Sequence, residues 1–73
     1  MPATPQPEKG TQTVRRAVRA LKLIASQPGN AMRLSDFADS MTLERSTAHR
    51  LLKALVDEGM LARDPASKRY GLG

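Results

Sequence analysis

Between residues 45 and 53 the chain gathers side chains that form hydrogen bonds or carry positive charge. They are Arg45, Ser46, Thr47, His49, Arg50 and Lys53. Arginine can donate two hydrogen bonds to the O6 and N7 atoms of guanine, and threonine offers a hydroxyl to bases or phosphate and a methyl group to thymine. A bidentate pair of this kind discriminates against a wrong base by about 1–3 kcal/mol. These residue types indicate recognition of base edges.

The surrounding stretch, residues 42–59, has the periodicity of a helix with two different long faces. One face is apolar, with Ala48, Leu51, Leu52, Leu55 and Val56. The opposite face carries Ser46, Arg50 and Lys53, with Thr47 and His49 on its flanks. Glu44 suits the positive end of a helix dipole, and Gly59 suits the left-handed residue that ends a helix. We predict a helix over residues 44–58 that packs its apolar face on a core.

A first helix is predicted to run from an N-cap at Thr13 to about Ser26, before the helix-breaking residues 28–30. Its predicted apolar stripe contains Val14, Ala17, Val18, Leu21, Ile24 and Ala25. Leu23 lies outside the stripe, where it is either an ordinary exposed leucine or a dimer contact. The basic residues opposite the stripe are either solvated or in contact with phosphate, and they are Arg15, Arg16, Arg19 and Lys22.

Between these helices lies a short extended piece, residues 31–34, too short to form a sheet alone. Ser35 is predicted to cap a second helix that ends near Met41. After the longer helix, residues 61–72 alternate around a turn at 64–67 and predict a β-hairpin. Tyr70 and Leu72 share one face of its second strand. The order predicts a mainly α fold with a small β-hairpin: a winged helix-turn-helix of three helices plus a wing.

Composition is consistent with a small nucleic-acid-binding domain. The chain has 73 residues, and 12 basic residues against 7 acidic ones give a net charge of +5, which favours a polyanionic partner. Residues 1–10, with three of the five prolines, are predicted to be a disordered arm before a domain spanning residues 11–73. Neither a membrane span nor a signal peptide is evident, so we expect a cytoplasmic protein.

The residues predicted to contact DNA form two groups. Base edges are assigned to Arg45, Ser46, Thr47, His49 and Arg50. The phosphate backbone is assigned to Arg33, Ser35, Lys53, Lys68 and Arg69. The last two, in the wing, have an alternative role, because basic residues also protect an edge strand from aggregation.

Catalytic and metal-binding functions have little support in the sequence. His49 is the only histidine, the chain has no cysteine, and no carboxylate lies at ligand spacing on the face of His49. There is no glycine-rich phosphate loop and no pairing of a nucleophile with a base. We therefore expect no enzyme activity, no metal and no cofactor.

The segments RAVRALKLIAS, RLSDFADSMTLERSTAHRLLKALVDEGML and RDPASKRYGLG, in this order and spacing, resemble the N-terminal winged helix-turn-helix domain of IclR-family bacterial transcriptional regulators. The resemblance covers nearly the whole chain after the arm. It implies a regulator, usually a repressor and sometimes an activator, that binds double-stranded operator DNA as a homodimer or a dimer of dimers. It also implies a small-molecule effector bound by a C-terminal domain that this chain lacks.

By the same resemblance, Arg45, Thr47 and Arg50 fall at positions that commonly contact DNA in the family. The chain departs from the family at Thr42, where glycine is frequent, and at Glu44, where proline is frequent. A β-branched residue is strained in a left-handed turn. Thr42 is therefore expected either to adopt another geometry or to carry strain.

Two other functions compete with this interpretation. A winged-helix domain can instead be a protein–protein interaction module, which would expose an apolar patch on the third helix. A protein that coats RNA or DNA without specificity would expose aromatic residues for base stacking. The third helix has no such patch, and Phe37 and Tyr70 are both expected to point inward.

Overall fold

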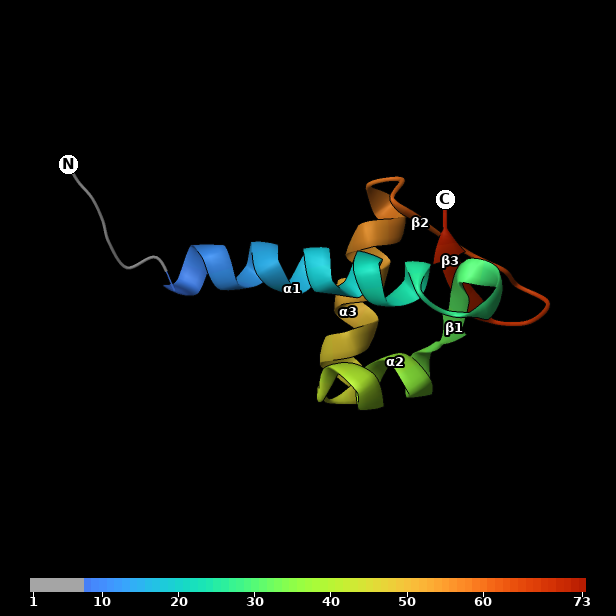
Figure 1. Cartoon of the computed structure of the whole chain (residues 1–73), viewed down its shortest axis with the longest axis horizontal. Coiled ribbons are helices and arrows are strands. Elements are labelled where there is room, and N and C mark those ends of the chain that lie inside the picture. Colours follow the sequence, from blue (N-terminus) through green and yellow to red (C-terminus); the bar gives the residue numbers. More distant parts are fainter. Residues whose placement is uncertain (1–7) are drawn as a thin grey trace.

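The computed structural model describes residues 8–73 as a helical domain with a small sheet at one end (Figure 1). Its elements in chain order are α1 (Glu8–Ala25), the 3-10 turn η1 (Pro28–Asn30), β1 (Ala31–Arg33), α2 (Leu34–Met41), α3 (Arg45–Asp57), β2 (Leu61–Arg63) and β3 (Arg69–Leu72). The strands form an antiparallel sheet in the order β1-β3-β2. This arrangement confirms the predicted winged helix-turn-helix.

Helix α1 begins earlier than the sequence predicted. It starts at Glu8, so Thr13 is inside the helix and is not its N-cap. The predicted arm, residues 1–10, overlaps the helix at residues 8–10, and residues 1–7 lie outside the described part of the chain. No proline follows Pro7 until the end of the helix. The backbone can therefore enter the helix before a capping residue appears.

The buried side of α1 also differs from the predicted stripe. Ala20 and Ile24 are fully buried. Three residues of the predicted stripe are exposed, namely Val14, Val18 and Ala25. Leu23, predicted to be exposed, is half-buried and packs against the core. The N-terminal half of α1 extends beyond the other elements (Figure 1). The apolar side chains in that half therefore have no other element to pack against.

The short extended piece before α2 is a strand of the sheet. In β1, Ala31 pairs with Gly71 and Arg33 pairs with Arg69 of β3. A Cβ atom built on Gly71 would lie 3.1 Å from the carbonyl oxygen of Asn30 and 3.3 Å from the Cβ of Ala31. Glycine at this position therefore lets β1 lie close to β3. The pairing ties the start of the helix-turn-helix to the wing.

The core lies where the helices meet the sheet. Its largest fully buried side chains are Phe37 of α2, Ile24 of α1 and Leu52 of α3. Tyr70 of β3 is 5% exposed and closes the core on the sheet side. The predicted inward orientation of Phe37 and Tyr70 is therefore confirmed. Leu72, on the same face of β3 as Tyr70, is 45% exposed because it lies at the end of the sheet.

The turn between α2 and α3 begins with a left-handed residue. Thr42 has φ 57° and ψ 50°, so it takes the strained alternative of the two that the sequence left open. The turn is closed by two hydrogen bonds: the Thr42 N–H donates to the carbonyl of Asp39 at 3.2 Å, and the Leu43 N–H donates to that of Ala38 at 2.9 Å. These bonds satisfy carbonyl groups at the end of α2.

The ends of α2 and α3 agree with the sequence in part. Helix α2 begins at Leu34 with Arg33 as its N-cap and without a side-chain cap, so the prediction that Ser35 caps it is wrong. The β1–β3 pairing holds Arg33 in extended backbone, which fixes where the helix can begin. Helix α3 begins within one residue of the prediction, after Glu44. Gly59, with φ 80°, is the predicted left-handed residue beyond its end.

Candidate nucleic-acid interface

Helix α3 has the two faces that its periodicity predicted. Ala48 and Leu52 are fully buried against the core, and Leu55 is 8% exposed. Ser46 and Arg50 are exposed on the opposite side. The helix therefore presents polar side chains to solvent over its whole length while its other face anchors it in the domain.

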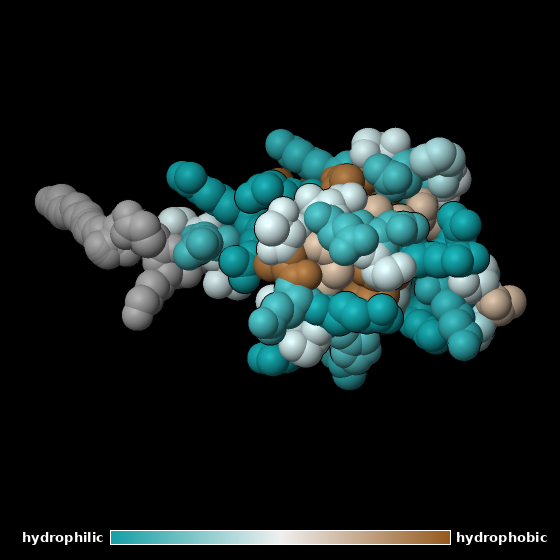
Figure 2. Space-filling model, turned by 90° about the horizontal axis from the view of Figure 1, so that it is seen from below, coloured by the Kyte–Doolittle hydropathy of each residue, from teal (hydrophilic) through white to brown (hydrophobic). Residues whose placement is uncertain are grey.

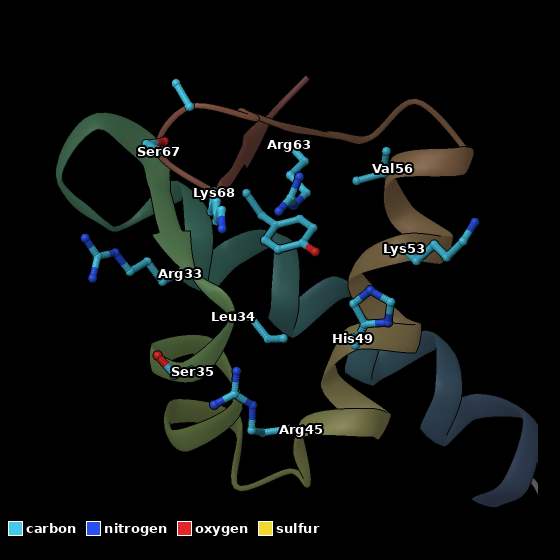
Figure 3. A pocket seen from close by; sticks show the side chains of 12 residues that line it. Arg33, Leu34, Ser35, Arg45, His49, Lys53, Val56, Arg63, Ser67 and Lys68 are labelled. Atoms are coloured by element: carbon cyan, nitrogen blue, oxygen red, sulfur yellow. The ribbon is translucent and has the colours of Figure 1, made fainter.

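A hollow of about 690 Å³ lies between α3, the start of α2 and the wing (Figure 3). Its basic lining residues come from several elements, and they are Arg33, Arg45, Lys53, Arg63 and Lys68. Among the described residues that line it, none is acidic. We call this site the basic hollow. Although Asp57 pairs with Lys53 beside the concavity, the surplus of positive charge among its lining residues attracts a polyanion.

The predicted base-contacting residues point in different directions. Arg45 and His49 line the basic hollow, and the Arg45 side chain points toward the start of α2, near Ser35 (Figure 3). Ser46 and Arg50 are exposed and do not line it, and Thr47 is half-buried on the other flank of α3. The sequence placed these five residues together at one end of the helix. The structure instead divides them into a hollow-lining pair (Arg45 and His49), an exposed outer row (Ser46 and Arg50) and Thr47 on the remaining flank.

The predicted backbone-contacting residues are divided in a similar way. Arg33, Ser35, Lys53 and Lys68 all line the basic hollow. Lys53 also forms an exposed ion pair, with its Nζ atom 3.0 Å from Oδ2 of Asp57 one turn along α3. Arg69 is exposed and lies outside the hollow, opposite Arg33 in the sheet.

The turn of the wing is closed by its own hydrogen bonds. Asp64 accepts hydrogen bonds from the Ser67 hydroxyl at 2.7 Å, the Ser67 N–H at 3.2 Å and the Ala66 N–H at 3.3 Å. The Lys68 N–H donates to the Asp64 carbonyl at 2.7 Å, and Lys68 is left-handed with φ 62°. Aspartate commonly closes turns in this way.

These hydrogen bonds also lower the pKa of the Asp64 carboxyl group. The pKa of Asp64 lies below its ordinary value, first because the Ser67 hydroxyl donates to its carboxylate and then because the Ser67 and Ala66 N–H groups do. The positive charge of Arg63 lowers the pKa further. Asp64 is therefore ionised at neutral pH, and its carboxylate accepts the hydrogen bonds that close the turn.

Arg63 is a residue of the hollow that the sequence did not single out. Its guanidinium carbon lies 6.0 Å from the ring centroid of Tyr70, within the range of a cation–π contact. In β2, Arg63 shares a face with the buried Leu61 and pairs with Tyr70. Strand alternation from Leu61 was the available signal, since it places Arg63 on the same side of the wing.

The molecular surface beside the hollow is mainly polar. Figure 2 looks onto the end of the molecule formed by α2 and the start of α3, and hydrophilic side chains cover most of that face. The large apolar residues that are exposed in the described chain lie on α1, just before β2 or in β3, and they are Val14, Val18, Met60 and Leu72. None of them belongs to α3, whose exposed face is therefore suited to a polar ligand.

Comparison with known proteins identifies the family of this winged helix-turn-helix. The family model of the IclR helix-turn-helix domain matches residues 13–65. The chain belongs to the IclR family. It is an IclR-type winged helix-turn-helix, the DNA-binding domain of transcriptional regulators. The resemblance inferred from the sequence motifs is thus confirmed, and the curated relatives give no support to a protein-interaction module.

Several curated regulators are similar to this IclR domain. The glycerol operon regulatory protein of Streptomyces coelicolor is 40% identical over 65 residues, which are 89% of this chain and 25% of that protein. The HTH-type transcriptional regulator XynR of Escherichia coli is 36% identical over 62 residues, 85% of this chain and 24% of XynR. The IclR domain therefore spans about a quarter of the length of the curated relatives it matches.

Solved structures of IclR proteins have the same fold. An IclR transcriptional regulator from Alicyclobacillus acidocaldarius matches with a TM-score of 0.78 and 32% identity, over 85% of this chain and 25% of that one. HmgR of Pseudomonas aeruginosa matches with a TM-score of 0.72 and 30% identity, over 85% of this chain and 26% of that one. Both alignments include most of this IclR domain and a minor part of the longer protein.

The described residues lack two structural features. In residues 8–73, the structure contains no helix of the length and apolarity that crossing a bilayer requires. Nor do the described residues of this IclR domain bring together three or more histidine, cysteine, aspartate or glutamate side chains in a group suited to a metal ion.

Proposed function

We propose that this IclR domain binds double-stranded operator DNA by placing α3 in the major groove and the wing against the backbone. The basic hollow between α3 and the wing carries this proposal, because it is rich in cations, free of lining carboxylates and continuous with the exposed row of α3. A helix of this size fits the major groove, and its N-terminal residues lie closest to base edges. The domain acts by binding and has no catalytic role.

The hollow-lining pair and the outer row of α3 should contact different parts of DNA. Ser46 and Arg50, in the outer row, are best placed to contact base edges, with Thr47 beside them. Arg45 and His49, which line the hollow, lie where a phosphate backbone would run along it. Base readout therefore rests mainly on the outer row, and the hollow supplies affinity that depends little on sequence.

The experiment that tests this function is selection of binding sites from random DNA with the 73-residue chain. One short consensus sequence is expected, and fluorescence anisotropy should show it to be preferred over unrelated duplexes. Affinity should fall steeply with salt, because each neutralised phosphate contributes about 0.9 to the slope of log K against log salt concentration. Failure to enrich any sequence, or binding insensitive to salt, would contradict the proposal.

The longer relatives suggest how the domain is used. We propose that it works in the cytoplasm as part of a longer repressor that forms a homodimer or a dimer of dimers and responds to a small-molecule effector through a further domain. Two recognition helices would then lie about 34 Å apart, one turn of DNA. A palindromic consensus with half-sites spaced by about one helical turn would support the dimer, and a single unrepeated half-site would contradict it.

A further inference from the structure

Two arginines face each other where β1 meets β3. Arg33, the last residue of β1, is the register partner of Arg69, the first residue of β3. Directly opposite residues in an antiparallel pair share one face of the sheet, with Cβ atoms about 4.5–5.5 Å apart. Both arginines are exposed, and like charges in this relation destabilise a sheet. The fold therefore places two positively charged residues opposite each other on one face of the sheet.

Neither arginine forms an ion pair among the described side chains, although Asp64 lies across from Arg69 and its N–H donates to the Arg69 carbonyl at 2.9 Å. Among the side chains of residues 11–73, the ion pair that the structure contains joins Lys53 to Asp57 on α3, away from both arginines. Lys68, adjacent to Arg69, adds a third positive charge, and its left-handed backbone is fixed by the hydrogen bond to the Asp64 carbonyl. Arg33 and Lys68 lie on the same side of the basic hollow (Figure 3).

We propose that Arg33 and Arg69 together bind one phosphodiester group of the DNA backbone, with Lys68 adding charge beside it. This inference rests on the proposed function. Guanidinium groups match the geometry of a phosphate and form two parallel hydrogen bonds to it. A bound phosphate turns the repulsion between the arginines into attraction.

Thermal unfolding without DNA tests the repulsion. Arg69→Gln is expected to raise the Tm of the 73-residue chain by about 1–4 °C, because it removes one of two opposed like charges. The rise should shrink in 1 M NaCl, where the screening length is about 3 Å. Arg15→Gln, which removes the same charge from an exposed position on α1, is the matched control and should leave the Tm unchanged. Equal shifts in both variants would overturn the proposal.

Binding to the selected duplex tests the shared phosphate. Arg33→Gln and Arg69→Gln should each weaken binding about fivefold at 0.15 M salt and lower the salt slope by about 0.9, the values for one phosphate contact. The double variant should lose little more than either single variant, since the same contact is lost in all three. Losses that multiply in the double variant would assign the arginines to separate phosphates and overturn the proposal.

A neutral backbone provides an independent check. Single methylphosphonate substitutions along the duplex should include one position at which the wild-type chain loses about fivefold in affinity and the Arg69→Gln variant loses nothing further. Wild-type binding that neither arginine variant changes would contradict this inference alone. A wild-type chain that binds no duplex would instead contradict the proposed function.

Discussion

At the scale of single side chains, the direction in which a residue leaves α3 decides what it can contact. Arg45 and Arg50 have the same chemistry and lie one and a half turns apart. Arg45 lines the basic hollow, and Arg50 belongs to the exposed outer row. Phosphates are alike at every step of DNA and base edges are not, so these two arginines should affect binding in different ways.

Alanine substitution should separate these roles. Arg50→Ala is expected to weaken binding to the selected sequence by about 1–3 kcal/mol while changing non-specific binding little, and to relax the consensus at one position. Arg45→Ala should weaken binding to all sequences alike and lower the salt slope by about 0.9. Anisotropy titrations on selected and scrambled duplexes would measure both. Equal loss on both duplexes for Arg50→Ala would reassign it to the backbone.

Thr42 offers a second test at this scale, because it is held in the left-handed region. That conformation costs a residue other than glycine about 1–2 kcal/mol. Glycine removes this cost, but its greater freedom in the unfolded chain cancels part of the gain in stability. Thr42→Gly should therefore raise the free energy of unfolding by about 0.5–1 kcal/mol in urea denaturation. Ser40→Gly, inside α2, is the control and should lower it by a similar amount. Destabilisation by both would show that Thr42 is not strained.

At the scale of elements, the sequence correctly predicted the features that depend on residues close together in the chain. The two faces of α3, the end of that helix at Gly59 and the wing all follow from periodicity and turn residues within a few positions. The pairing of β1 with β3 joins segments far apart in the chain, so no local pattern predicted it. The same limit explains Arg63 and the split of the predicted base-contacting residues, which depend on where the wing lies relative to α3.

The stability of the wing turn should decrease in acid because Asp64 becomes protonated. Its pKa is lowered in the folded chain, so its contribution to stability is complete above about pH 4, the range of an unperturbed aspartate, and is lost as pH falls through the lowered value. NMR titration should show the Ser67 amide shifting in that acid window. Asp64→Asn should abolish the shift and leave α3 unaffected. An unchanged Ser67 titration in the variant would contradict this role.

At the scale of the whole molecule, the domain is small and depends on few large side chains. Phe37 is fully buried between α2 and the rest of the core. A chain of this size is stable by about 3–10 kcal/mol, and truncation of a buried phenylalanine costs about 3–5 kcal/mol. One side chain therefore accounts for a large share of the margin that keeps the interface assembled.

Phe37→Ala should accordingly leave much of the chain unfolded at 37 °C, and circular dichroism would show the loss of helix. Leu72→Ala, at the 45% exposed end of the sheet, should lower the free energy of unfolding by less than about 1 kcal/mol. DNA binding by Phe37→Ala should recover on cooling together with the helix signal. Full stability of Phe37→Ala would contradict the packing described for the core.

The self-closed turn of the wing also has a thermodynamic consequence for docking. Ordering a flexible side chain on association costs about 0.5–1.5 kcal/mol, and ordering a loop adds to this. Asp64 already holds Ser67 and the turn backbone in place before any ligand arrives. The backbone of this turn therefore has little conformational entropy left to lose when it docks. Calorimetry should then show binding whose entropy is dominated by released counterions.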